Sequence, residues 1–148
     1  MGEYIVEAKD LCKYFKAGKN QTLKAVDGVN IRLEKGETLG LVGESGCGKT
    51  TCGRTLVKLY DATSGTVMFE GKDVSKLKGK ELLGFRKDAQ IIFQDPYASL
   101  NPRMTVGEVI AEPLNIQKRC NSKEEVREQV LKVMEVVGLN PKYYNRYP

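Results

Sequence analysis

One stretch of nine residues limits what this chain can fold into more than any other feature of its sequence. The stretch is GESGCGKTT, Gly43 to Thr51, which combines three glycines with a lysine and two threonines. It satisfies the phosphate-loop pattern G-x-x-x-x-G-K-[ST], with Gly48, Lys49 and Thr50 at its closing positions. This pattern requires an apolar strand before the loop and a helix after it.

The residues on either side of the loop meet that requirement. Thr38 to Val42 is a short apolar run bounded by turn residues, which predicts a strand buried on both faces. After the loop, KTTCGRTLVKLY predicts a helix with one inner face. The residues at helical spacing on that face are Cys52, Thr55, Leu56 and Leu59. The expected fold class is therefore α/β.

Such a loop is suited to hold the phosphates of a nucleotide. Glycines let successive backbone N–H groups turn toward one point, and the helix adds its unsatisfied N-terminal donors. Lys49 would place its charge on the β- and γ-phosphates, Thr50 would offer a hydroxyl to Mg²⁺, and Thr51 would donate to the α-phosphate. The simpler alternative is a glycine-rich turn that only caps a helix. The predicted phosphate-binding residues are Gly43, Glu44, Ser45, Gly46, Cys47, Gly48, Lys49, Thr50 and Thr51.

The first two thirds of the chain contain further strand and helix signals. We expect strands at Glu3 to Phe15 and Lys24 to Glu34, a hairpin at Thr66 to Val74, a short helix at Lys78 to Arg86 and a brief strand at Ala89 to Phe93. The last strand runs into Gln94-Asp95-Pro96, where the proline ends it.

The remaining residues predict helices. Asn101 to Leu114 predicts a loop and a helix interrupted by Pro113, and Ser122 to Leu139 is the clearest helix in the sequence. Ser122 and Glu125 predict a capping box at its start. Its predicted packing face is Val126, Val130, Val133, Met134 and Val137, and Gly138 followed by Pro141 predicts its end.

Composition excludes several classes of function. No apolar run approaches a membrane span and the N-terminus does not resemble a signal peptide, so we expect a cytoplasmic protein. The four cysteines form no C-x-x-C pair and there is no histidine, which argues against a mixed zinc site and against Ser-His or Cys-His catalysis. The net charge is +5, but the basic residues are interleaved with acidic ones along the chain and form no continuous basic stretch. No nucleic-acid partner is therefore expected.

Three segments together resemble a known family. LVGESGCGKTT, IIFQDPYASLNPRMTVGEVIAEPL and the closing NRYP are similar to the ATP-binding subunits of ABC transporters, in the oligopeptide, dipeptide and nickel importer branch. The resemblance covers essentially the whole chain, and FQDPYASLNPRMTV is close to diagnostic for the branch. It implies the N-terminal portion of an ABC-type P-loop NTPase, a mixed sheet with antiparallel strands and the start of a helical subdomain. Residues 1–94 would form the nucleotide-binding core, and residues 95–148 the Q-loop and helical part.

The resemblance also implies roles for individual residues, with ATP and Mg²⁺ as ligands. An aromatic residue in the first strand stacks on adenine in this family; the family spacing favours Phe15 over Tyr14, and neighbours on a strand face opposite ways. Gln94 matches the glutamine that contacts Mg²⁺ and the attacking water, so Lys49 and Gln94 carry the implied catalytic roles. Segment Asp95 to Met104 would face the transmembrane permease.

The family further implies a second ATP-binding subunit, only indirect contact with a substrate-binding protein, and a peripheral position on the inner face of the cell membrane. The family's signature motif, its Walker B strand with the catalytic acid and its switch histidine do not occur in these residues, which predicts a fragment that binds Mg-ATP weakly without turnover. The segment IIFQD is a poor Walker B strand because Gln94 interrupts it and Pro96 follows. A P-loop kinase or GTPase of another class and a non-catalytic nucleotide-binding module remain alternatives, although the guanine-reading N-K-x-D pattern is missing.

Overall fold

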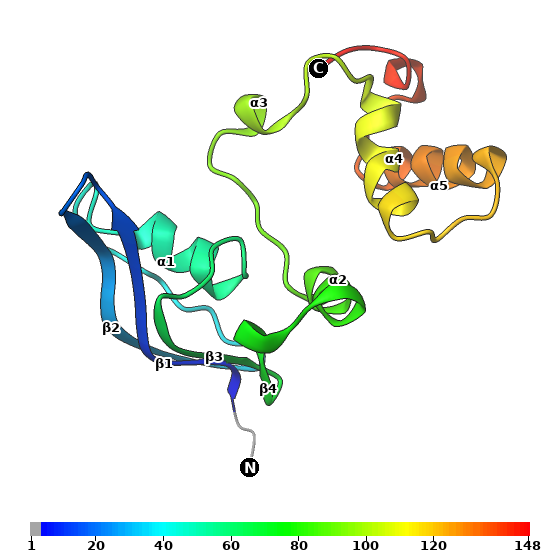
Figure 1. The fold of residues 1–148 in the computed structure, drawn as a ribbon. Helices are drawn as coiled ribbons and strands as arrows, with labels where there is room; N and C mark the ends of the chain where they lie inside the picture. The colour runs from blue at the N-terminus through cyan, green and yellow to red at the C-terminus, as the bar shows by residue number, and fades with distance from the viewer. Residues whose placement is uncertain (1–3) are drawn as a thin grey trace. The chain divides into compact units, whose positions relative to one another are not determined.

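The protein divides into two compact units along the chain. In this computed structural model residues 4–148 are described, except for the side chain of residue 96. The first unit is Met1–Ile91 and the second is Ile92–Pro148, and Figure 1 identifies their helices and strands. No helix of the described residues is long and apolar enough to cross a membrane.

The first unit is built on an antiparallel sheet of four strands in the order β2-β1-β3-β4. The strands are β1 (Tyr4–Lys16), β2 (Thr22–Glu34), β3 (Ser64–Phe69) and β4 (Lys72–Asp73). In the register, Ala8 lies opposite Ile31 on one side and opposite Val67 on the other. The two long strands and the hairpin predicted from the sequence are confirmed; Glu3, the predicted first residue of β1, lies outside the described part of the chain.

The hairpin between β3 and β4 turns at two residues with left-handed backbone. Glu70 has φ 46° and Gly71 has φ 76°. Positive φ at both central residues is typical of the type I′ turn, whose twist matches that of the flanking strands. The turn of the predicted hairpin therefore lies at Glu70 and Gly71, between β3 and β4.

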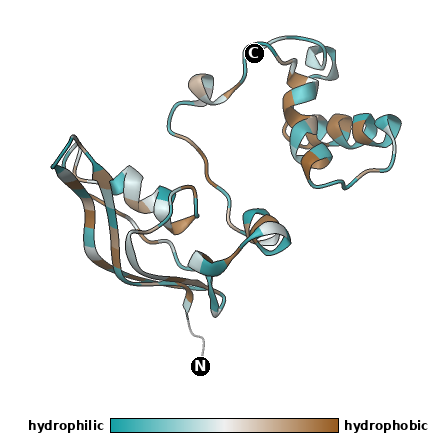
Figure 2. Cartoon of the chain, viewed as in Figure 1, coloured by the Kyte–Doolittle hydropathy of each residue, from teal (hydrophilic) through white to brown (hydrophobic). Residues whose placement is uncertain are grey.

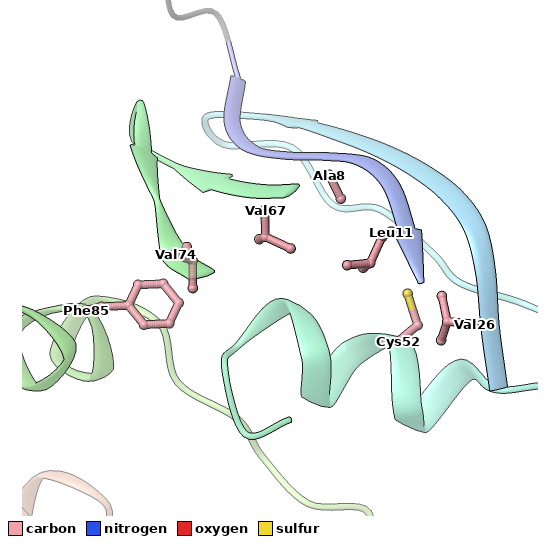
Figure 3. Packing of buried hydrophobic residues seen from close by; sticks show 7 residues of the cluster. All are labelled: Ala8, Leu11, Val26, Cys52, Val67, Val74 and Phe85. Carbon is pink, nitrogen blue, oxygen red and sulfur yellow. The ribbon is translucent and has the colours of Figure 1, made fainter. Parts of the chain in front are cut away.

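Helix α1 (Lys49–Leu56) packs on this sheet, and α2 (Gly79–Asp88) follows a 3-10 turn at Val74–Lys76. Figure 3 shows the side chains of Leu11, Val26 and Cys52 pointing toward one another between β1, β2 and α1. The buried core of the unit is Ala8, Leu11, Val26, Cys52, Val67, Val74 and Phe85. Of the predicted α1 face, Cys52 and Thr55 are buried and Leu56 packs against the core, but Leu59 lies beyond the end of the helix and is 45% exposed.

Two predicted strands are not present. Thr38 to Val42 and Ala89 to Phe93 have no strand conformation, and apart from Ala89, which packs against the core, their apolar side chains are exposed: Val42 is 89% and Ile92 is 97% accessible. Figure 2 shows apolar colour along the connection between α2 and α3. The prediction is wrong because a buried strand needs paired neighbours, and no described strand pairs with either segment.

An apolar groove of about 340 Å³ in the first unit is lined by residues of both segments, including Ala89 and Ile91 of the second. Its walls also include Leu39 and Leu41 from the first segment, Leu56 from α1 and Phe69 from β3. The side chains that were expected to fill a sheet core instead line an open apolar surface.

The second unit is helical. Its elements are α3 (Pro96–Ser99), α4 (Val106–Ile116), α5 (Lys123–Val136) and a 3-10 turn at Pro141–Tyr143. Ala111 of α4 packs against Val130 and Met134 of α5 in the buried centre. Val133 and Val137, predicted on the packing face of α5, are 46% and 67% exposed, because the face that meets α4 is narrower than the apolar pattern.

The helix ends differ in detail from their predictions. The complete capping box is at Thr105 and Glu108, at the start of α4, where each side chain bonds the other residue's backbone. At α5, Ser122 Oγ accepts from the Glu125 N–H at 3.1 Å, but the Glu125 carboxylate accepts from Asn121 N–H. Only half of the predicted box is therefore present. Pro113 does not interrupt α4, which continues to Ile116.

Candidate phosphate-binding site

The glycine loop has a backbone conformation that residues with a Cβ rarely adopt. Gly46 has φ 81° and Gly48 has φ 99°, both in the left-handed region. A Cβ on Gly48 would lie 2.0 Å from the backbone oxygen of Ala25, in β2. The end of the loop therefore rests directly on the backbone of the sheet. Sequence reasoning missed Ala25, since nothing local marks a small residue in β2 as a support for the loop.

Helix α1 begins where the loop ends, and its first amides are available as donors. Gly48 is the N-cap residue and supplies no side-chain cap. The first helical hydrogen bond runs from Cys52 N–H to Gly48 O, at 2.8 Å. The N–H groups of Lys49, Thr50 and Thr51 precede that bond, so they lack an intrahelical acceptor and carry the positive end of the helix dipole. No acidic residue occupies the first turn, so the site favours an anion.

The Lys49 side chain lies against the loop. Its Nζ donates to the carbonyl oxygens of Gly43 at 2.7 Å and Glu44 at 2.6 Å, and it is 3.7 Å from Cys47 Sγ. The ammonium group therefore lies beside the backbone of the phosphate loop. Lys49 and the loop residues Gly43, Glu44 and Cys47 therefore lie together, and a helix follows, but the strand that the motif requires before the loop is not formed at Thr38 to Val42.

The following residues of α1 fix the site to the core. Thr55, which is 2% exposed, donates from Oγ1 to the Thr51 carbonyl at 2.7 Å. Cys52 is 4% exposed, and burial raises the pKa of its thiol. A buried thiol with a raised pKa is structural, whereas Thr50 is exposed at the helix start.

The two candidate aromatics of β1 have different surroundings. The ring of Phe15 meets that of Tyr60, which follows α1, edge to face at 5.6 Å between centroids and 85° between planes. The hydroxyl of Tyr14 instead donates to Asp27 of β2. Phe15 therefore contacts the connection that leaves α1, while Tyr14 is held by a polar cluster on β2.

Hydrogen bonds within the polar cluster around Tyr14 shift the pKa values of its residues. The hydrogen bond to Asp27 raises the pKa of the Tyr14 phenol, and the same bond, with help from Lys24, lowers the pKa of Asp27. Hydrogen bonds from Tyr14, Ser64 and the Gly28 amide lower the pKa of the Cys12 thiol. These groups satisfy one another, so the cluster has a structural role.

Gln94 and the segment after it belong to the second unit, whereas Lys49 belongs to the first. Gln94 is exposed. Asp95 caps the short helix α3, accepting from the N–H groups of Tyr97 at 3.0 Å and Ala98 at 3.1 Å. The roles predicted for Gln94 and for Asp95 to Met104 remain predictions.

A glycine loop seated on a sheet, followed by a helix with free amides and a lysine at its start, defines a P-loop nucleotide-binding fold. The sequence matches the ABC transporter family over residues 26–147. The chain therefore belongs to the ABC transporter family.

Curated relatives are similar over nearly all of this chain. The oligopeptide transport ATP-binding protein OppF of Bacillus subtilis is 52% identical over 100% of this chain and 48% of its own length. OppF of Escherichia coli is 52% identical over 97% of this chain and 46% of its own length. The dipeptide transport ATP-binding protein DppF of Lactococcus lactis is 49% identical over 97% and 47%, respectively. The chain thus spans about half the length of these relatives.

Solved structures share the fold. The ATP-binding cassette MJ0796, in a dimeric post-hydrolysis state with ADP and Pi, superposes with a TM-score of 0.78 at 28% identity. The match covers 97% of this chain and 61% of that one. A nucleotide-free cassette from an ABC transporter matches with a TM-score of 0.69 at 28% identity, covering 97% of this chain and 57% of the other. The α/β, ABC-type fold class predicted from the sequence is confirmed.

Proposed function

We propose that this chain binds the triphosphate of Mg-ATP at Gly43 to Thr51. The observation that carries the proposal is the position of Lys49, whose ammonium lies 2.7 Å from the Gly43 oxygen at a helix start with three amides that lack an intrahelical acceptor. Amide donors and a fixed cation together suit a group with several negative oxygens.

Magnesium would be held in part by Thr50. This residue is the second of α1, and its exposed hydroxyl is a hard oxygen donor of the kind that Mg²⁺ accepts beside water and phosphate. Bound Mg²⁺ would neutralise charge on the phosphates and hold them in line for transfer. Gln94 is the second proposed contact, with a part in orienting the attacking water.

The adenine base would stack on Phe15. Gly48 rests on Ala25, and Ala25 lies between Lys24 and Val26, which pair with Tyr14 and Lys13 in the sheet. The phosphate loop therefore lies near the part of β1 that carries Phe15. The contact of Phe15 with Tyr60 at the end of α1 further favours Phe15 over Tyr14.

We further propose that the protein energises the import of oligopeptides or dipeptides. The similarity to relatives named as oligopeptide and dipeptide transport ATP-binding proteins supports this proposal. ATP hydrolysis would require a second ATP-binding subunit, as the dimeric state of MJ0796 suggests. Asp95 to Met104 would dock on the permease, at the cytoplasmic face of the membrane. The 148 residues contain no histidine and by themselves would bind Mg-ATP without turnover.

The two unpaired apolar runs fit the same proposal. In a polypeptide as long as these relatives, Thr38 to Val42 and Ala89 to Phe93 would form strands by pairing with additional strands. Their exposed apolar side chains, and relatives about twice as long, support this view. Strand addition would bury the groove beside Leu41.

Calorimetric titration of Mg-ATP tests the proposal. Lys49→Ala removes a charge whose attraction to a phosphate 4 Å away is on the order of 4 kcal/mol before desolvation, so affinity should fall by about 100-fold or more. Lys132→Ala is the control, because Lys132 pairs with Glu128 on the surface of α5. An unchanged dissociation constant for Lys49→Ala would refute the proposal. Titrating GTP in parallel separates an ATP-binding subunit from a guanine-specific protein.

A further inference from the structure

We propose that Tyr60 is a positioning residue for the nucleotide base: it holds the ring of Phe15 ready to stack. This inference rests on the proposed function, because it takes Phe15 as the residue that contacts adenine. We do not propose that Tyr60 contacts the base directly. Its effect on binding would pass through Phe15.

The contact between the two rings is specific. The centroids of Phe15 and Tyr60 are 5.6 Å apart, and the rings are nearly perpendicular. This edge-to-face arrangement is a favoured one for aromatic pairs, because the positive edge of one ring meets the negative face of the other. Phe15 is near the end of β1 and only half-buried, so part of its side chain is accessible to a ligand.

Tyr60 is fixed by the last turn of α1. Its hydroxyl accepts a hydrogen bond from Arg54 Nη1 at 3.0 Å, and its N–H donates to the Arg54 carbonyl at 3.2 Å. The guanidinium carbon of Arg54 also lies 5.8 Å from the Tyr60 ring centroid. The first residues of α1 form the phosphate site, so the same helix positions the phosphate donors and the support for Phe15.

The ammonium group of Lys13 lies near both rings of the aromatic pair. Its Nζ is 5.0 Å from the Phe15 centroid and 5.8 Å from the Tyr60 centroid. A cation within about 6 Å of a ring face is attracted to it. If Phe15 rotated away from Tyr60, it would give up the ring contact and disturb the shared cation.

A ring held in one orientation loses less conformational freedom when a base stacks on it. Loss of Tyr60 should therefore weaken the base contact while the phosphate contacts persist. From the strength of aromatic pairs we expect a loss of about 2- to 10-fold in affinity for the base-containing ligand.

The test compares Mg-ATP with Mg-tripolyphosphate, which has the phosphates and no base. Both ligands are titrated by calorimetry into the wild-type chain and into Tyr60→Leu, Tyr60→Phe and Phe15→Leu. Tyr4→Leu is the matched control: Tyr4 is also in β1 and also lies against an arginine, Arg32 at 5.4 Å, on the other end of the strand. The quantity compared is the ratio of the two dissociation constants.

We expect Tyr60→Leu to reduce the preference for ATP over tripolyphosphate by about 2- to 10-fold, with tripolyphosphate binding unchanged. Tyr60→Phe should keep most of the preference, and Tyr4→Leu all of it. If Phe15→Leu lowers the preference and Tyr60→Leu does not, the inference about Tyr60 is overturned and the proposed function survives. If Phe15→Leu also has no effect, the proposed adenine contact fails. Equal weakening of both ligands by Tyr60→Leu would indicate a purely structural role and overturn the inference.

NMR provides a second readout that needs no nucleotide. In the wild-type chain the Phe15 ring should show NOEs to Tyr60 and couplings of a single χ1 rotamer. Tyr60→Leu should average those couplings, while Tyr4→Leu leaves them unchanged. Unaveraged Phe15 couplings in Tyr60→Leu would mean that Tyr60 does not hold the ring.

Discussion

Gly48, the last glycine of the phosphate loop, lies directly on the carbonyl of Ala25 in β2. A Cβ on Gly48 would be 2.0 Å from that oxygen, and the backbone φ of 99° already disfavours any residue with a Cβ. Two factors therefore set the conformation of the loop: the glycines in its own sequence, and its close contact with the backbone of the sheet. This contact ties the position of the phosphate donors to the register of β2.

Gly48→Ala should weaken both folding and nucleotide binding. A left-handed non-glycine residue costs about 1–3 kcal/mol, and the clash with a backbone atom adds to that cost. Chemical denaturation and Mg-ATP calorimetry would measure the two effects. Gly53→Ala is the control: Gly53 is inside α1, and a Cβ there would meet nothing within 4 Å, so this change should stabilise by about 0.5–1 kcal/mol. A Gly48→Ala protein that is as stable as Gly53→Ala would contradict the packing described above.

Gly107→Ala should destabilise the second unit. A Cβ on Gly107 would lie 2.7 Å from the Tyr144 ring, and the Gly107 N–H also donates to the Tyr144 carbonyl at 2.8 Å. Overpacking of this kind costs roughly 1–3 kcal/mol. In a Tyr144→Leu background the smaller side chain relieves the clash, so Gly107→Ala should cost less there. Denaturation of the four proteins of this cycle would reveal the coupling, and its absence would show that the ring adapts freely.

The Tyr14–Asp27 pair should make the free energy of unfolding depend on pH in both the acidic and the alkaline range. The pKa of Asp27 is lowered by the bond from Tyr14, so its contribution is present above its unfolded pKa of about 3.9 and lost as pH falls through the lower folded value. The pKa of Tyr14 is raised by the same bond, so its contribution is present below about pH 10 and lost as pH rises through the higher folded value.

Denaturation midpoints measured across pH check this expectation. Tyr14→Phe should flatten both ends of the profile, and ultraviolet titration of the wild-type protein should show one phenol ionising later than free tyrosine. Tyr97→Phe changes a side chain that is 84% exposed and should leave the profile unaltered. A profile of Tyr14→Phe that matches wild type at both extremes would rule out the coupling.

The cysteines should differ sharply in their reaction with a thiol reagent. Cys47 is exposed in the phosphate loop, whereas Cys12 and Cys52 are 8% and 4% exposed. Burial also raises the pKa of Cys52, which lowers its thiolate fraction. Native protein should therefore react rapidly at Cys47 and at Cys52 only after unfolding, as followed by absorbance and peptide mapping. Saturating Mg-ATP should slow the Cys47 reaction, and Cys47→Ser should remove the fast phase; labelling of Cys52 before Cys47 would contradict the burial pattern.

Features that depend on neighbouring residues along the chain followed from the sequence alone. The phosphate loop, the hairpin within Thr66 to Val74 and the helix end at Gly138 are set by backbone preferences and short-range hydrogen bonds. The motif likewise predicted that Lys49 would lie at the start of a helix, which it does.

Features that need a distant partner were decided only by the tertiary structure. Thr38 to Val42 has a strand's composition but no described strand beside it, because ladder hydrogen bonds must come from elsewhere in the chain. The supports of Gly48 by Ala25 and of Phe15 by Tyr60 join residues far apart in sequence. Apolar spacing reveals that a helix such as α5 has an inner face, but the width of that face depends on what packs against it, so Val133 and Val137 remain exposed.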